Sequence, residues 1–181
     1  SQMSYLHELV SAFGIQRYEI EGYEADDIIA TITKRAEKEK CEILICTGDR
    51  DSFQLVNEQT TILYPKRGVS EMSRMTPQAV ITKYGMSAEQ YPDFAALRGD
   101  PSDNLPSVPG VGEKTAAKWI VDFGSLKELL ANADTLGGKV GQSLRDNIDN
   151  VIRNRELTQL VHDAPMNFEI DALMWPGPDE S

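Results

Sequence analysis

The chain has 181 residues, of which 40% are hydrophobic, so it is long and apolar enough to fold around a core, either as one large domain or as one domain with a small appendage. Its formal net charge is −11, which taken alone argues against nucleic-acid binding, because Lys and Arg neutralise phosphates. The average still allows local basic patches. No apolar run approaches about 18 residues and no signal peptide opens the sequence, so we expect a soluble cytoplasmic protein.

The first part of the chain alternates helical and strand-like segments. Apolar spacing predicts helices over residues 3–13, 25–39, 76–84 and 88–97. It also predicts strands at Tyr18–Ile20, Glu42–Thr47 and Thr61–Tyr64. The second strand is apolar without alternation, as expected for a strand buried on both faces of a parallel sheet. This order predicts an α/β fold with a partly parallel sheet flanked by helices.

Beyond Asp103 the pattern becomes helical throughout. Helices are predicted over residues 113–123, 125–131 and 141–161. Residues 167–181 are rich in Pro, Gly and acids, which is typical of a tail or linker. The predicted domains are an α/β metal-binding core (1–103), a helical DNA-binding lobe (104–165) and a C-terminal tail or linker (166–181).

Seven carboxylates stand in three tight groups, each at the predicted boundary of an element: Glu24, Asp26 and Asp27; Asp49 and Asp51; Asp100 and Asp103. Two carboxylates near 4 Å repel by roughly 4 kcal/mol at an effective dielectric of about 20, so clustered acids protonate, stay apart or bind cations. Hard oxygen ligands suit Mg²⁺ or Mn²⁺. A pair of such ions roughly 3.5–4 Å apart is the usual apparatus for phosphodiester hydrolysis.

Each acidic group also has an ordinary alternative. Acids in the first turn of a helix stabilise its dipole, and an Asp after a strand often caps the next helix. Three such groups together favour the metal interpretation. Asp26 and Asp27 are adjacent and cannot share one helix face, so we expect one to bind metal directly and the other to act through water or a supporting contact.

The segment Leu105–Trp119 has the pattern of a Gly-x-Gly hairpin between two helices, with Val111 between Gly110 and Gly112. The glycines permit backbone angles and close approaches that a side chain forbids. Free N–H groups of the following helix, with Lys114, Thr115 and Lys118, suit a DNA phosphate without reading base sequence. The alternatives are an ordinary αα-hairpin and, for Trp119, a place in the core. Lys66-Arg67-Gly68 is predicted to form an exposed turn, and Arg50 to tune or cap the acids.

These motifs in this order resemble the 5′-nuclease superfamily. The segments that carry the resemblance are Glu24–Asp27, Thr47–Asp51, Leu97–Leu105 and Pro109–Ala117. More narrowly, they are similar to the 5′→3′ exonuclease domain of bacterial DNA polymerase I, of an actinobacterial type, over about residues 5–165. The resemblance implies a PIN-like 5′-nuclease core, followed by a lobe with a helix–hairpin–helix-like motif.

The resemblance also implies an activity. The family cleaves flapped or nicked duplex DNA by two-metal-ion hydrolysis in replication and repair, working with or fused to a DNA polymerase. By that likeness Glu24, Asp26 and Asp27 serve a first metal, and Asp49, Asp51, Asp100 and Asp103 hold a second. The hairpin grips the duplex, and carbonyls of Pro106, Val108 and Val111 are the candidates for a bound K⁺.

The family pattern begins with a strand carrying a further metal-binding Asp, which this sequence does not contain before its helix at residue 3. We therefore expect an N-terminally truncated core whose parent is active and whose own activity is in question. Two alternatives stay open. One is a duplex-binding module without catalysis, and the other is an acid-dependent phosphatase or nuclease on an unrelated α/β scaffold.

Overall fold

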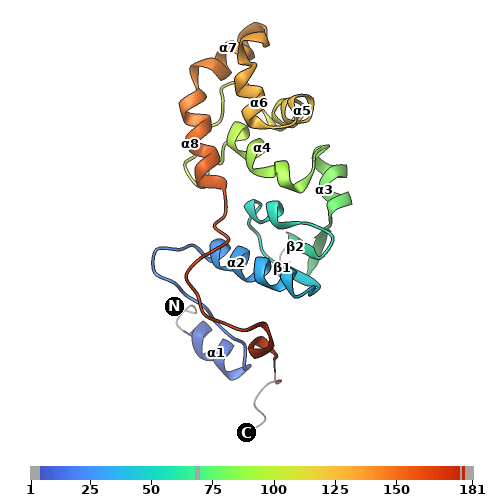
Figure 1. The fold of residues 1–181 in the computed structure, drawn as a ribbon, viewed down its shortest axis with the longest axis vertical. Helices are drawn as coiled ribbons and strands as arrows, with labels where there is room; N and C mark the ends of the chain where they lie inside the picture. Colours follow the sequence, from blue (N-terminus) through green and yellow to red (C-terminus); the bar gives the residue numbers. More distant parts are fainter. Residues whose placement is uncertain (1–4, 68–69, 176, 178–181) are drawn as a thin grey trace.

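The computed structural model describes residues 5–67, 70–175 and 177, and it shows an elongated molecule with an α/β part joined to a helical lobe (Figure 1). The α/β part contains α1 (Leu6–Ala12), α2 (Ala25–Lys38), β1 (Ile43–Cys46), the 3-10 helix η2 (Asp51–Leu55), β2 (Thr60–Arg67), β3 (Glu71–Met75) and α3 (Pro77–Tyr84). After it come η3 (Ala88–Gln90), α4 (Tyr91–Arg98), α5 (Glu113–Phe123), α6 (Leu126–Ala131), η4 (Ala133–Thr135), α7 (Gly138–Asp146), α8 (Ile148–Thr158) and η5 (Ile170–Leu173). The predicted fold class is confirmed.

The sheet has the strand order β1-β2-β3, in which β1 and β2 are parallel and β2 and β3 are antiparallel. β3 was not predicted, because its exposed Glu71 and Arg74 hide the strand pattern. The predicted turn at Lys66-Arg67-Gly68 is wrong for its first two residues, which belong to β2, and Gly68 lies outside the described residues. The sheet is therefore mixed, as the term "partly parallel" anticipated.

Two further strand predictions need correction. Leu44 in β1 is 51% exposed while Ile45 is buried, so within the described residues only one face of β1 is covered. Residues 18–20, which were predicted to form a strand, pair with no strand among the described residues. Instead, the ring of Tyr18 packs on Phe168, with ring centroids 6.0 Å apart. Tertiary packing has overridden the local β pattern in this segment.

Helix boundaries follow their capping residues. Thr76 caps α3 by accepting a hydrogen bond from the backbone N–H of Ala79 at 3.3 Å, and a left-handed Gly85 ends that helix. The single helix predicted over 141–161 is instead α7 and α8, separated at Asn147. The Asn147 side chain donates to the Ser143 carbonyl at 2.8 Å, and Asn side chains compete in this way with helix continuation.

One hydrophobic core runs through both parts, and α4 lies at its centre. Tyr91, Phe94 and Leu97 of α4 are fully buried, and the Tyr91 ring contacts Phe53 of η2 edge-on, with centroids 5.5 Å apart. Trp119 is buried in the same core, as its core interpretation predicted. This packing fixes the loop after α4 relative to the loop after β1, and those two loops carry four of the seven acids.

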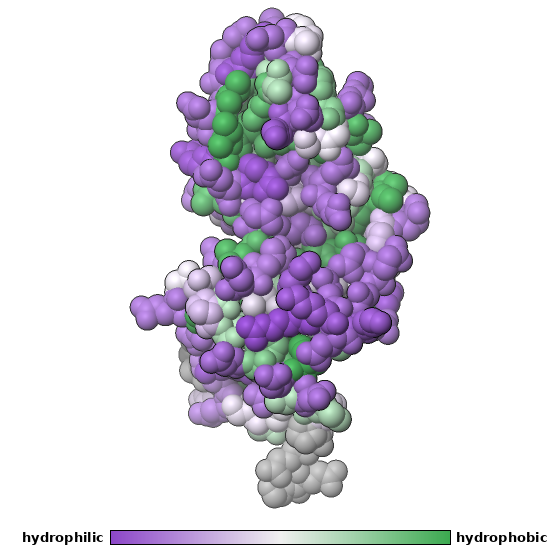
Figure 2. Space-filling model, in the orientation of Figure 1, coloured by the Kyte–Doolittle hydropathy of each residue, from purple (hydrophilic) through white to green (hydrophobic). Residues whose placement is uncertain are grey.

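The segment after α8 runs back past α2 to α1 (Figure 1). Arg35 of α2 donates to the Met166 carbonyl at 2.7 Å, and the Trp175 indole N–H donates to the Phe13 carbonyl at 2.6 Å. The described residues of the predicted tail are thus attached to the α/β part. Figure 2 shows a mostly hydrophilic face with hydrophobic patches on the helical lobe. Within the described residues, no helix has the length and apolarity to cross a membrane.

Candidate metal centre

All seven predicted acids line two adjoining pockets that share Asp49 and Asp103. We call the first the acidic pocket, of about 560 Å³, and its carboxylates are Glu24, Asp26, Asp27, Asp49, Asp51, Asp103 and Glu156. We call the second the arginine pocket, of about 410 Å³, and its charged residues are Asp49, Arg50, Arg98, Asp100, Asp103 and Glu113. Three segments distant in sequence therefore meet at one place.

The loop after β1 places Asp49 and Asp51 beyond the carboxyl end of that strand. The backbone N–H of Asp49 donates to Thr47 Oγ1 at 3.0 Å, and Asp49 Oδ1 accepts from the backbone N–H of Asp51 at 2.8 Å. These two local bonds form a tight turn of the kind that Asp and Thr side chains favour. The sequence Thr-Gly-Asp-Arg-Asp thus fixes the backbone of this turn and the carboxylate of Asp49.

The adjacent acids at the start of α2 have different environments. Asp26 Oδ1 accepts a hydrogen bond from Ser52 Oγ of η2 at 3.1 Å. Both oxygens of Asp27 are occupied by backbone donors: the N–H of Glu24 at 3.3 Å and the N–H of Val161 at 2.9 Å. Asp27 therefore joins α2 to the segment after α8, while the charge of Asp49 acts on Asp26.

The third acidic segment depends on a glycine turn. Gly99 has φ +69°, and a Cβ atom there would lie 2.5 Å from the backbone nitrogen of Ser107, so only glycine fits. Asp100 then accepts from the Ser102 backbone N–H at 2.9 Å and from the Ser102 hydroxyl. It also pairs with Arg98 at 3.2 Å. This carboxylate is neutralised within the chain.

The acids differ in pKa according to these surroundings. Burial, and then the charge of Asp49, raise the pKa of Asp51 to about 7. The pKa of Asp26 is raised by burial, with Asp49 next in importance, and burial likewise raises the pKa of Asp103. The hydroxyl of Ser102 lowers the pKa of Asp100. The three carboxyl groups with raised pKa, Asp26, Asp51 and Asp103, all line the acidic pocket.

The donor set suits a hard divalent cation, although no closed cage is formed. In the described part of the chain, no three His, Cys, Asp or Glu side chains are arranged closely enough to hold an ion among them. Mg²⁺ usually keeps several waters and binds through one or two carboxylates, so it does not need such a cage. Burial and the neighbouring acids raise the pKa of Asp51, so the surrounding protein stabilises its negative charge poorly. A bound cation favours the ionised forms of the carboxyl groups, so the residues present fit a divalent metal ion.

The predicted DNA-binding hairpin forms at the entrance to α5. Gly110 has φ +80°, Val111 is buried, and Gly112 occupies the N-cap of α5 without a side chain to cap it. Lys114 is exposed, whereas Lys118 pairs with Asp122 on its own helix at 2.5 Å. Thr115 is half-buried and its N–H donates to Gly112. Lys114 is therefore better placed than Lys118 to meet a phosphate.

The three carbonyls predicted for potassium are partly engaged. Pro106 accepts from the Asn154 side chain at 2.8 Å, and Val108 accepts from the N–H of Val111 at 2.9 Å. A carbonyl oxygen has two lone pairs, so each keeps acceptor capacity. The potassium site stays a prediction.

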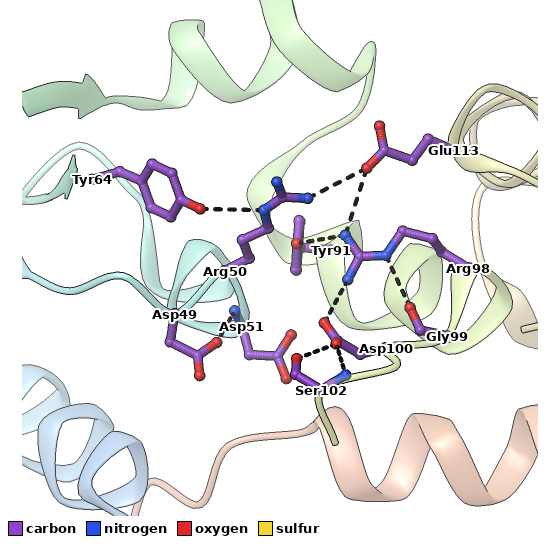
Figure 3. Close-up of polar contacts among 10 residues, drawn as sticks. All are labelled: Asp49, Arg50, Asp51, Tyr64, Tyr91, Arg98, Gly99, Asp100, Ser102 and Glu113. Carbon is purple, nitrogen blue, oxygen red and sulfur yellow. Dashed lines mark hydrogen bonds and ion pairs between the residues drawn. The ribbon is translucent and has the colours of Figure 1, made fainter. Parts of the chain in front are cut away.

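Sequence reasoning missed the network that surrounds Arg98. In Figure 3 its guanidinium lies between Asp100, the Tyr91 hydroxyl and Glu113, and Arg50 reaches Glu113 from the other side. Its position two residues before Asp100 was the signal in the sequence that could have pointed to Arg98. Glu113 gave none, since a first-turn acid ordinarily serves the helix dipole.

Comparisons with known proteins find matching family models and relatives. Residues 1–85 match the family model "5′-3′ exonuclease, N-terminal resolvase-like domain", and residues 86–181 match "5′-3′ exonuclease, C-terminal SAM fold". DNA polymerase I of Mycobacterium bovis is 56% identical over 172 residues, covering 95% of this chain and 19% of the relative. That of Bacillus subtilis is 41% identical over 177 residues, covering 97% and 20%. The chain spans about a fifth of the length of these relatives.

Solved structures share the fold. The T5 5′-exonuclease with bound zinc has a TM-score of 0.72 at 23% identity, covering 90% of this chain and 61% of that one. The catalytic core of Rad2 in complex with DNA substrate has a TM-score of 0.59 at 19% identity, covering 98% and 60%. The two family models together match the whole sequence and confirm the resemblance: the chain belongs to the 5′-3′ exonuclease family.

Proposed function

We propose that this chain is a metal-dependent 5′→3′ exonuclease and flap endonuclease domain, which hydrolyses phosphodiesters of flapped or nicked duplex DNA. The observation that carries the proposal is the meeting of seven carboxylates from three segments in two pockets that share Asp49 and Asp103. Family membership supports the same activity. The relatives' names also suggest a polymerase as the companion, and DNA as substrate suggests a cytoplasmic location.

Two divalent ions, Mg²⁺ or Mn²⁺, would supply Lewis acidity toward a phosphodiester when bound at these carboxylates. Glu24 and Asp26 would hold one, directly or through water, with Asp27 positioning the start of α2. Asp49, Asp51, Asp100 and Asp103 would hold the second, directly or through water. Ser52 and Ser102 orient Asp26 and Asp100 by donating hydrogen bonds to them.

The hairpin residues would bind the duplex without reading its sequence. Lys114 and the N-terminus of α5 contact a backbone phosphate, with a K⁺ at the carbonyls of Pro106, Val108 and Val111 as a further link. Lys114→Ala should weaken duplex binding about threefold to tenfold and reduce its salt dependence by about one phosphate contact. Lys118→Ala should do less, because Lys118 is paired with Asp122. Lys38→Ala, an exposed lysine of α2, serves as the matched control.

The deciding experiment is cleavage of a 5′-end-labelled flap duplex by this chain in Mg²⁺, Mn²⁺ or EDTA, beside a binding assay on the same DNA. Short products that require metal, and disappear in Asp49→Asn/Asp51→Asn without loss of binding, would support the nuclease. Asp134→Asn, an exposed acid outside both pockets, is the control.

A second candidate is a duplex-binding module without catalysis. It is favoured by the lack, among the described residues, of three acids already arranged around an ion. This alternative predicts salt-sensitive duplex binding that divalent metal hardly alters, and no metal-dependent product. The same assay separates the two.

A further inference from the structure

Two arginines of the arginine pocket share a single carboxylate oxygen. Arg50, from the loop after β1, places Nη1 3.5 Å from Glu113 Oε1. Arg98, at the end of α4, places Nη1 3.8 Å from the same oxygen. Figure 3 shows the two guanidinium groups converging on Glu113 from different elements. Guanidinium groups recognise carboxylate and phosphate oxygens, and here two of them already lie around one anionic oxygen.

The three members differ in how firmly they are held. The side chain of Arg98 is 11% exposed and is fixed by Asp100 at 3.2 Å and by the Gly99 carbonyl at 3.0 Å. Glu113 is 56% exposed, and both of its contacts are longer than an ordinary charged hydrogen bond. Arg50 is 43% exposed and, among the described residues, has one other hydrogen-bond partner, the Tyr64 hydroxyl at 3.4 Å. Glu113 is therefore the member that leaves most easily, from a pair of arginines that is already assembled.

We propose that Arg50 and Arg98 form a receptor for one phosphate group of the DNA, and that Glu113 occupies this receptor until DNA displaces it. The proposal rests on the proposed function, because it needs a nucleic-acid substrate. A phosphate offers several oxygens where Glu113 offers one, so it can engage both guanidinium groups with shorter bonds. Its charge also repels the carboxylate that it replaces.

The location gives the receptor a use in the reaction. The arginine pocket shares Asp49 and Asp103 with the acidic pocket, so a phosphate held by the arginines lies beside the candidate metal ligands. Glu113 is the first residue of α5 and directly follows Gly112 of the hairpin. Displacement of Glu113 would therefore link DNA contact at the hairpin to phosphate binding beside the acids. The phosphate is either an internal phosphodiester or a terminal 5′-phosphate.

The first test uses inorganic phosphate as the probe, in EDTA, with the arginine Nε–Hε NMR signals of the full 181-residue chain as the readout. Phosphate should shift the signals of Arg50 and Arg98. Glu113→Gln should bind phosphate about fivefold more tightly, which corresponds to about 1 kcal/mol, because the competing carboxylate is gone. Arg50→Gln should bind about fivefold more weakly. Arg153→Gln, an exposed arginine outside both pockets, should match the wild type.

The inference is wrong if Glu113→Gln binds phosphate no more tightly than the wild type, or if Arg50→Gln binds it equally well. Arg98 is not the test residue, because its loss would also disturb Asp100. The Glu113→Gln arm predicts a gain, which a merely unfolded variant cannot produce. Thermal melting of each variant checks the fold independently.

A second test uses nicked duplexes that carry either a 5′-phosphate or a 5′-hydroxyl, bound in EDTA. A loss of affinity in Arg50→Gln with both duplexes identifies an internal phosphodiester, and a loss only with the first identifies the terminal phosphate. Equal affinity of the wild type and Arg50→Gln for both duplexes overturns the receptor. The flap-cleavage assay is scored separately. If the wild type cleaves but neither Glu113→Gln nor Arg50→Gln changes the affinity for phosphate, the receptor alone is overturned. Phosphate binding as predicted without metal-dependent cleavage overturns the nuclease alone.

Discussion

The two pockets share Asp49 and Asp103 but compensate their charge differently. In the arginine pocket, Ser102 and Arg98 hold the pKa of Asp100 below its ordinary value. In the acidic pocket, burial and neighbouring carboxylates raise the pKa of Asp51 and of Asp26. The acidic pocket thus carries charge that suits a cation, whereas in the arginine pocket two arginines offset part of the acidic charge and can also meet an anion. A phosphodiester attacked with the help of metal needs both kinds of site side by side.

The largest effect should come from a residue common to both pockets. Asp49→Asn removes a carboxylate beside Asp26 and Asp51, so metal-dependent cleavage of the flap duplex should fall at least about 1,000-fold, or about 4 kcal/mol in activation free energy. Duplex binding in EDTA should stay within about twofold. Asp134→Asn is the control, and a cleavage rate of Asp49→Asn near that of the control would exclude Asp49 from metal binding.

Gly99→Ala tests the glycine turn that positions Asp100 in the arginine pocket. A Cβ at Gly99 would lie 2.5 Å from Ser107 N and 2.6 Å from Leu105 O, at φ +69°. Such a clash in a left-handed conformation should lower the free energy of unfolding by about 3 kcal/mol in urea titration. Gly137→Ala, where a Cβ meets nothing within 4 Å, should lose less than about 1 kcal/mol. Equal losses in the two variants would contradict the rigid turn that we describe.

Asp51→Asn tests the raised pKa in the acidic pocket through the pH dependence of folding stability. The pKa of Asp51 is about 7 in the folded chain, above its ordinary value near 3.9. The unfolded chain therefore ionises this group first, and folded stability is lost as pH rises from about 4 through 7. In EDTA, Asp51→Asn should exceed the wild type in stability at pH 8. That advantage should shrink by about 1–2 kcal/mol at pH 5. Calorimetry at both pH values measures it, and an advantage independent of pH would contradict the raised pKa.

Local signals in the sequence were sufficient for much of the fold and for the composition of the site. Thr76-Pro77 and Gly124 mark helix ends, and each acidic group lies on a short motif at an element boundary, so both could be predicted. β3 and the break at Asn147 were missed because charged residues and a helix-compatible spacing conceal them.

The division into two pockets was beyond the sequence for a different reason. It depends on α4, whose buried aromatic residues set the loop carrying Asp100 against the loop carrying Asp49. The contact between Arg50 and Glu113 joins residues 63 apart, and no local pattern specifies it. Tertiary packing, which composition and periodicity do not describe, decides which charges meet.

The smallest predicted effect distinguishes two neighbours within the acidic pocket. Both carboxylate oxygens of Asp27 accept hydrogen bonds from backbone N–H groups, those of Glu24 and Val161. Asp27 therefore serves mainly to stabilise the fold. Asp27→Asn should cost about 1 kcal/mol of stability, since an amide can accept only one of these bonds without repelling the other donor. Asp26→Asn should cost little stability, because it relieves repulsion, but should weaken Mn²⁺ binding at least about tenfold. Isothermal titration with Mn²⁺ and urea unfolding of both variants give the comparison. If Asp27→Asn lost more metal affinity than Asp26→Asn, Asp27 would be the direct ligand, and the bond to Val161 would have to break when metal binds.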